Sequence, residues 1–166
     1  FAAFNYPALA DVGVGIHCRY GVIAKPEGVF SVDTSVSNEA AIVKVFPGLT
    51  EPLLRTMRSA EGLRGVILET YGAGNAPTFG WFIRTLEEAI RRGVHIINIT
   101  QCASGSVNMD IYETGRRLQD IGVISGRDMT TEAALTKMMC MLGRAYTHEE
   151  FVGVMKRPVR GEMTEE

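Results

Sequence analysis

Polar side chains and glycines gather in short stretches that directly follow apolar runs of the sequence. These stretches are Pro47-Gly48, Tyr71 to Pro77, Thr100 to Gly105 and Ser125 to Thr130. Their hydroxyl, amide and carboxylate groups can hold a small polar molecule through hydrogen bonds. If the fold brings the stretches to one edge, they indicate a site for a small molecule or an interface with another chain.

Two glycines beside Asn75 resemble part of a dinucleotide-binding pattern. That pattern requires a third glycine where this chain has Pro77, so the nucleotide-cofactor interpretation fails. We interpret Gly72 and Gly74 as residues that allow a tight turn and a close approach of the backbone. Asn75 is then the residue of this stretch that can contact a ligand.

Thr100 and Cys102 follow a run that predicts a strand. The hydroxyl of Thr100 and the free backbone groups at a strand end can bind a ligand, or Thr100 simply closes a strand as a β-branched residue. Cys102 stands where a nucleophile can sit, but no histidine near it in the sequence can activate the thiol. For Cys102 we favour a buried, inert cysteine.

Two carboxylates also bear on the site. Glu69 lies in a strand that we expect to be buried, so its carboxylate requires a partner, water or an interface. Asp128 stands just before a predicted helix, and we expect it to cap free N–H groups there together with Thr130.

The composition excludes several classes of function. The net charge is −2, from 17 basic and 19 acidic residues, so no basic excess favours nucleic acid as the main partner. No apolar run approaches the roughly 20 residues that span a membrane, and no signal peptide appears. The cysteines and histidines are scattered, which predicts reduced thiols in a cytoplasmic protein and no metal site. They are Cys18, Cys102, Cys140, His17, His95 and His148.

Apolar periodicity predicts the elements that must position these residues. From residue 40 onward, short apolar runs alternate with amphipathic stretches. We expect strands over 41–46, 65–71, 95–100 and 123–124, and helices over 52–60, 82–92, 111–121 and 133–142. Thr147 and Glu150 have the spacing of a capping box, so a last helix begins there.

Such alternation predicts an α/β fold with a mainly parallel sheet of about four strands and helices on both faces, a Rossmann-like or flavodoxin-like three-layer sandwich. The strand-to-helix loops then meet at one edge. Residues 1–38 differ from the rest and are expected to form an extended arm with one or two short strands, for example near 28–33. Residues 39–166 form the α/β domain, and the polar tail after Pro158 is expected to be loose.

Several segments, in order along the chain, resemble the L-asparaginase family, and its cytoplasmic type I branch best. They are Asn5 to Ala10, Val45 to Gly48, Leu68 to Pro77, Asn98 to Cys102, Gly122 to Gly126 and Asp128 to Lys137. The resemblance implies hydrolysis of L-asparagine to L-aspartate and ammonia by threonine nucleophiles, without a metal or cofactor. The TGGT-like and TDT-like motifs that carry those threonines are absent here. The resemblance therefore implies a C-terminal domain that holds no catalytic residue.

The same resemblance implies that residues 1–38 connect this domain to an N-terminal domain, in keeping with a first residue, Phe1, that is not methionine. It also implies a homodimer or homotetramer in which Asn75 reaches the substrate across a subunit interface. Some members bind asparagine at a second, regulatory site, whose matching residues are Glu69, Thr100 and Cys102. Those members have arginine where this chain has Glu69, and a carboxylate would repel the effector's carboxylate. We therefore expect no activation by asparagine of that kind.

Other hypotheses remain open from the sequence. The chain can be a non-catalytic domain for small-ligand binding or assembly. It can be the ammonia-releasing subunit of a tRNA-dependent amidotransferase, although its acidic balance favours the simple amidohydrolase. An unrelated flavodoxin-like binding domain rests on analogy of fold alone.

Overall fold

The computed structural model describes residues 4–25, 28–58 and 60–165 and is organised around a sheet of four parallel strands. The strands are β3 (Ala40–Lys44), β4 (Gly65–Thr70), β5 (His95–Thr100) and β6 (Ile124–Ser125). Their spatial order, β3-β4-β5-β6, is the order in which they occur along the chain. The register pairs Ile67 of β4 with Ile97 of β5, and every residue of β4 is buried.

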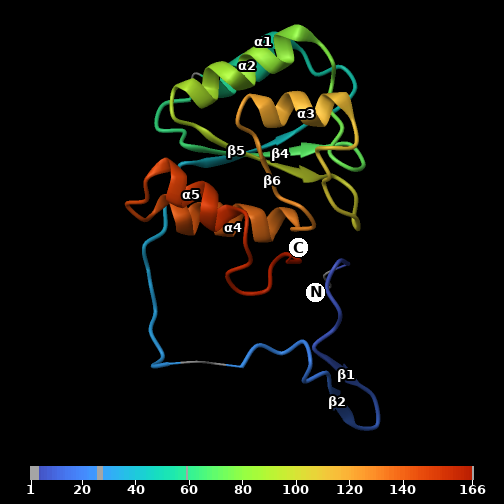
Figure 1. Cartoon of the computed structure of the whole chain (residues 1–166). Coiled ribbons are helices and arrows are strands. Elements are labelled where there is room, and N and C mark those ends of the chain that lie inside the picture. The colour runs from blue at the N-terminus through green and yellow to red at the C-terminus, as the bar shows by residue number, and fades with distance from the viewer. Residues whose placement is uncertain (1–3, 26–27, 59, 166) are drawn as a thin grey trace.

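Five helices of the described chain cover the two faces of this sheet (Figure 1). They are α1 (Glu51–Arg58), α2 (Gly80–Arg91), α3 (Glu113–Asp120), α4 (Thr131–Leu142) and α5 (His148–Met155). The strand order follows the chain order, so right-handed crossovers place α1, α2 and α3 on the same face. Helices α4 and α5 follow the last strand and cover the other face. The predicted α/β three-layer fold is confirmed.

Alternation along the strands divides the core into two layers. Val66 and Leu68 of β4 pack with α1, α2 and α3, whereas Ile67 packs with α4 and α5. Both faces of the inner strands are thus apolar, as expected for a parallel sheet covered on both sides. None of the helices in the described ranges is both long and apolar enough to cross a membrane.

The helix starts on the second face follow local capping rules, with one correction. The predicted capping box is confirmed, because the Thr147 hydroxyl accepts from the Glu150 N–H while the Glu150 carboxylate accepts from the Thr147 N–H. Helix α4 is capped by Thr130, whose hydroxyl accepts from the N–H of Ala133. The expectation that Asp128 shares this capping is wrong, because Asp128 lies too early in the chain and accepts from Thr164 instead.

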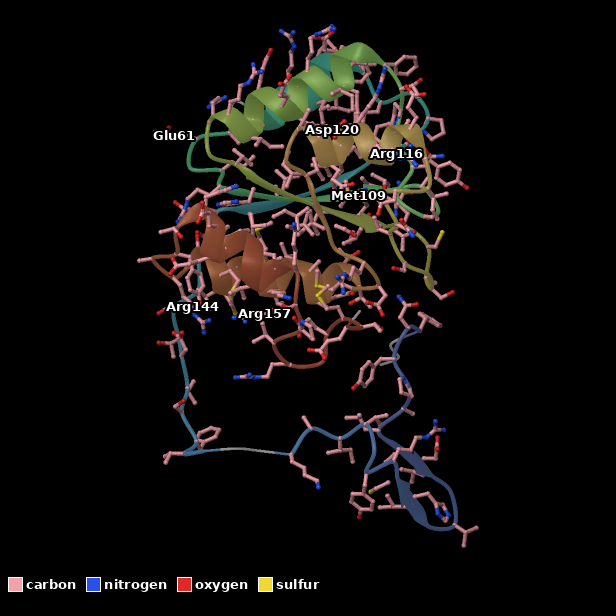
Figure 2. The ribbon with its side chains drawn as sticks, in the orientation of Figure 1. Glu61, Met109, Arg116, Asp120, Arg144 and Arg157 are labelled. Carbon is pink, nitrogen blue, oxygen red and sulfur yellow. The ribbon has the colours of Figure 1, made fainter. Side chains whose placement is uncertain are left out.

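The arm holds two short strands, as expected, but neither of them lies near residues 28–33, where the sequence predicted one. Strands β1 (Ala10–Val12) and β2 (Ile16–Cys18) pair as an antiparallel hairpin. Residues 28–33 form no strand, because no other described segment pairs with them and a strand requires a partner. The arm returns to the domain where Asp33 accepts from Arg144 at 2.8 Å, on the side where Figure 2 labels Arg144.

The C-terminal segment after Pro158 is anchored, which corrects the expectation of a loose tail. The buried ammonium of Lys137 lies 2.6 Å from the Glu162 carboxylate and also donates to the Arg157 carbonyl. Burial alone would raise the pKa of Glu162, but hydrogen bonds from Lys137 and from nearby backbone N–H groups hold it below its ordinary value. Met163 is buried in the same core. The sequence did not reveal this anchor because Lys137 lies on a different element, far from Glu162 along the chain.

Replacing Lys137 with methionine is expected to lower the free energy of unfolding by about 3–5 kcal/mol, because Glu162 loses the cation that offsets its burial. Urea denaturation measures the change. The double variant Lys137→Met/Glu162→Gln should recover part of the loss. As a matched control, Arg55→Met removes an exposed ion pair of the same 2.6 Å length with Glu51 and should cost less than about 1 kcal/mol. Equal losses in the two single variants would contradict this account.

A second prediction concerns His95, whose ring stacks on Phe151 with centroids 3.8 Å apart and on His148 at 5.3 Å. Burial, aided by the charges of His148 and Arg64, lowers the pKa of His95 from 6.5 to about 4. The folded state therefore favours neutral His95. Its contribution to stability is complete above pH 6.5 and falls as the pH drops from 6.5 to about 4.

The measurement is the melting temperature of the chain between pH 4 and pH 7. We expect His95→Phe to lose less stability than the original chain as the pH falls through this window, because its ring does not titrate. His17→Phe, at an exposed position of the hairpin, serves as the control and should keep the original pH dependence. If His95→Phe keeps that dependence too, the histidine is not responsible for it.

Candidate functional site

The loops after β3, β4, β5 and β6 meet at the carboxyl edge of the sheet, since all four strands are parallel. In open α/β sheets of this kind, ligands bind at that edge. Three of the polar stretches singled out in the sequence directly follow these strand ends, at Thr70, Thr100 and Ser125. The structure thus brings the candidate stretches together.

Asn75 ends a tight turn after β4. The N–H of Asn75 donates to the Tyr71 carbonyl at 2.7 Å, and the N–H of Tyr71 donates back to the Asn75 carbonyl at 2.8 Å. Gly72 and Gly74 have φ angles of 49° and 103°, which glycine adopts readily and other residues avoid. The glycines therefore shape the turn that presents the half-buried side chain of Asn75.

The buried side-chain amide of Asn98, which the sequence analysis did not single out, holds this turn through a hydrogen bond. Asn98 is 0% exposed. Its side chain accepts from the Thr70 hydroxyl at 2.7 Å and donates to the Gly74 carbonyl at 3.3 Å. The sequence did offer a signal for it, since Asn98 interrupts the apolar residues of the run His95–Thr100. A buried amide must be hydrogen-bonded, so such a residue indicates a structural contact.

The predicted regulatory residues do not converge. Thr100 and Cys102 are adjacent, since the Thr100 hydroxyl accepts from the N–H of Cys102 at 3.1 Å. Thr100 is paired with Thr70 in the sheet, and both side chains lie on the face that α1, α2 and α3 cover. The side chain of Glu69 contacts Thr131 of α4 and therefore lies on the opposite face. Neighbouring residues of a strand point to opposite faces, so the Glu69 side chain is separated from that of Thr100 by the sheet.

Glu69 has the partners that its burial requires. It is 8% exposed, accepts from the Thr131 hydroxyl at 2.5 Å, and lies 3.5 Å from the ammonium of Lys44. The expectation that Cys102 is buried is wrong, because the thiol lies in the loop beyond the end of β5 and is exposed. Within the described ranges, no group of three or more histidine, cysteine, aspartate or glutamate residues is placed to hold a metal ion.

The threonines near this edge are engaged in structural contacts. Thr70 donates to Asn98, Thr130 caps α4, and Thr131 donates to Glu69. Thr70 donates to a neutral amide and the Thr130 hydroxyl accepts from a backbone N–H, so neither contact supplies a general base. Thr131 is the one of these three that contacts a carboxylate.

Asn5 of the arm also reaches this edge, although the sequence indicated no role for it beyond family resemblance. Its amide donates to the carbonyls of Gly105 and Asp128 at 3.0 and 2.8 Å, and its carbonyl accepts from the Gly105 N–H at 2.9 Å. Asn5 therefore joins the loop after β5 to the loop after β6 and attaches both to the arm.

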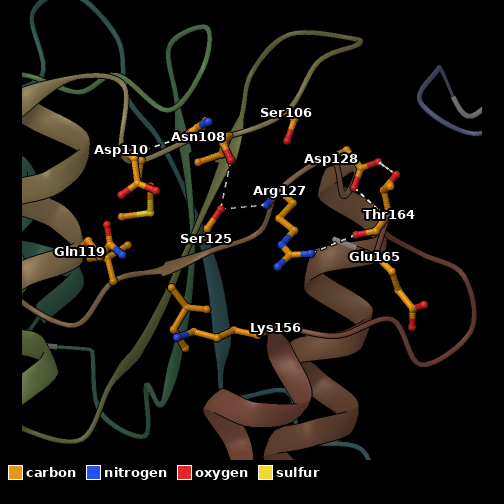
Figure 3. A pocket seen from close by; sticks show the side chains of 14 residues that line it. Ser106, Asn108, Asp110, Gln119, Ser125, Arg127, Asp128, Lys156, Thr164 and Glu165 are labelled. Carbon is orange, nitrogen blue, oxygen red and sulfur yellow. Dashed lines mark hydrogen bonds between the residues drawn. The ribbon is translucent and has the colours of Figure 1, made fainter.

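A cavity of about 640 Å³ opens beside β6, next to this junction (Figure 3). Arg127 and Lys156 line it together with Asp110, Asp128 and Glu165. Arg127 has a φ of 52° and donates to the Thr164 carbonyl at 3.2 Å. Two cationic and three anionic side chains line the cavity, so neither sign of charge dominates it.

Comparison with known proteins shows the family to which the chain belongs. Residues 39–155 match the glutaminase/asparaginase C-terminal domain family. The chain is 37% identical over 166 residues to L-asparaginase 1 of Escherichia coli (strain K12), covering 99% of this chain and 48% of that protein. It is 32% identical over 168 residues to a glutamyl-tRNA(Gln) amidotransferase component of Methanobrevibacter smithii, covering 99% of this chain and 38% of that protein.

The crystal structure of L-asparaginase I from Vibrio cholerae O1 is similar with a TM-score of 0.91 and 37% sequence identity. The similarity covers 99% of this chain and 50% of that one. The present chain thus spans about half the length of these two asparaginases. Residues 39–155, which match the domain family, contain the whole four-stranded sheet and all five helices described above. The chain belongs to the glutaminase/asparaginase C-terminal domain family.

Proposed function

We propose that this chain is the C-terminal domain of an L-asparaginase, an amidohydrolase that converts L-asparagine and water into L-aspartate and ammonia. The nucleophilic threonines belong to the part of the protein outside this chain. The observation that carries the proposal is the Asn75 turn, which holds a carboxamide at a carboxyl edge whose threonines are committed to structural contacts. The similarity to L-asparaginases over nearly the whole chain supports it.

The shape of the sheet supports a site completed by another domain. In doubly wound sheets, a reversal of strand order opens a crevice for the ligand. The described strands run in chain order without reversal, so this sheet supplies one wall only. Large apolar side chains are exposed near that edge, which favours contact with another protein surface. They are Phe46, Phe79, Ile111 and Tyr112.

We propose a second copy of the protein as the source of part of that surface, in a homodimer or homotetramer. Asn75 would then contribute to the site of the neighbouring subunit, as the resemblance implies. We also propose that the protein is cytoplasmic, as expected from its unpaired cysteines. The similarity to the amidotransferase component favours a second candidate, an ammonia-releasing subunit that acts on tRNA-bound glutamate. A requirement for tRNA in ammonia release would identify it.

The first test is ammonia release from L-asparagine by the isolated chain and by the full-length protein. We expect release by the full-length protein only, because the nucleophiles lie outside this chain. In the full-length protein, Asn75→Ala should lower kcat/KM by roughly tenfold or more, as expected for loss of a hydrogen bond to a charged ligand group. Release by the isolated chain would contradict the proposal and would direct attention to Thr131, with Thr131→Val as the deciding variant.

The regulatory site yields a separate prediction. We propose that L-asparagine does not act as an effector here, because Glu69 is a carboxylate and is separated from Thr100 by the sheet. Calorimetric titration of L-asparagine into the isolated chain should give no saturable heat. The full-length protein should show a Hill coefficient of about 1. Saturable binding that Thr100→Ala abolishes would contradict this proposal and restore Thr100 and Cys102 to a regulatory role.

A further inference from the structure

Thr114, in the first turn of α3, is buried at 7% exposure and donates its hydroxyl proton to the side-chain oxygen Oδ1 of Asn75. Helical threonines commonly bond to a backbone carbonyl of the preceding turn. Thr85 and Thr136 do so, at Trp81 and Glu132. The hydroxyl of Thr114 is instead directed to the side chain of a residue on another element.

The backbone on the Asn75 side of this contact is fixed. Two backbone hydrogen bonds join Asn75 to Tyr71, and Gly74 donates to the Tyr71 carbonyl at 3.0 Å. A β-carbon at Gly74 would lie 2.7 Å from Val107, so the turn packs closely on the segment that leads to α3. With the backbone held, the freedom that remains to Asn75 is rotation of its side chain.

The position of Thr114 is fixed as well. The next residue, Gly115, approaches the backbone of Met109 so closely that a β-carbon there would lie 2.5 Å from the Met109 carbonyl oxygen. Figure 2 labels Met109 between α3 and the sheet. The N–H of Asn108 donates to the Ala73 carbonyl at 3.0 Å, inside the Asn75 turn. Helix α3 and the turn are therefore held in one spatial relation, which keeps the hydroxyl and the carboxamide in contact.

We infer that Thr114 is a positioning residue that orients the Asn75 carboxamide with its NH₂ group away from α3. Once Oδ1 accepts from Thr114, the NH₂ group carries the donors that remain. Within the described ranges that NH₂ group donates no hydrogen bond. No deeply buried side-chain nitrogen of these residues lacks a partner, so the NH₂ group of Asn75 is not deeply buried and reaches solvent. Asn75 therefore recognises a hydrogen-bond acceptor, such as a carboxylate or a carbonyl of the ligand. That this ligand is L-asparagine rests on the proposed function.

The test compares Thr114→Val and Thr114→Ser in the full-length protein with L-asparagine as substrate. Valine keeps the buried volume but cannot donate, so the amide is free to turn. We expect Thr114→Val to raise KM about tenfold, with a smaller change in kcat, and Thr114→Ser to keep KM within about threefold of the original. Thr85→Val is the matched control, since it removes a buried hydroxyl on α2 and should leave KM unchanged.

Asn75→Asp provides a second variant that does not depend on how well Thr114→Val folds. The aspartate keeps an acceptor for Thr114 but replaces the outward NH₂ group with an oxygen, so KM should rise at least as much as in Thr114→Val. An unchanged KM in Asn75→Asp would overturn the inference. Equal increases in KM for Thr114→Val and Thr114→Ser would overturn it as well, because they would indicate a packing role.

A structural measurement separates this inference from the proposed function. If the original full-length protein releases no ammonia from L-asparagine, the proposed function fails, but the role of Thr114 is still decided by crystallography. Crystal structures of the full-length original and Thr114→Val proteins at better than about 1.2 Å resolution, where the amide oxygen and nitrogen can be told apart, should show the Asn75 side chain in one orientation in the original and in a changed or split orientation in the variant. The same single orientation in both would overturn the positioning role.

Discussion

The buried amide of Asn98 is the interaction on which the carboxyl edge depends. Its side chain joins the end of β4, through Thr70, to the turn above it, through the Gly74 carbonyl. Its backbone carbonyl accepts from the N–H of Gly126 at 2.7 Å, which attaches the loop after β6. An amide buried without partners costs several kcal/mol, so strand register and loop shape must satisfy it together. One residue in the middle of the sheet thus sets the relative positions of the end of β4 and of the two loops that follow β4 and β6.

The order of the strands explains why this edge is one wall of a site. Chain order and spatial order coincide, so every connecting helix lies on one face and no crevice opens between diverging helices. Such a surface presents side chains outward, and Asn75 is the polar group that its glycine turn presents. A partner surface that carries the reactive groups fits this geometry. In the proposed function, this edge orients a polar group, and the chemistry comes from outside this chain.

The two ends of the described chain attach to the same loops. Asn5 bonds to the loops after β5 and β6, and Thr164 bonds to Asp128 of the second loop. The C-terminal segment is held from the other side by the buried pair of Lys137 and Glu162. A displacement of the arm would therefore act directly on the loops of the carboxyl edge. These hydrogen bonds cross the predicted division between residues 1–38 and residues 39–166.

The helices and strands of the domain could be predicted from the sequence, because their signals are local. Apolar runs predicted the strands, helical spacing predicted the helices, and the spacing of Thr147 and Glu150 predicted a capping box. Which side chains meet could not be predicted, because those partners are far apart in sequence and on different elements. Examples are Asp128 with Thr164, Lys137 with Glu162, and Thr114 with Asn75. The faces of the sheet, which separate Glu69 from Thr100, likewise follow from strand register rather than from residue type.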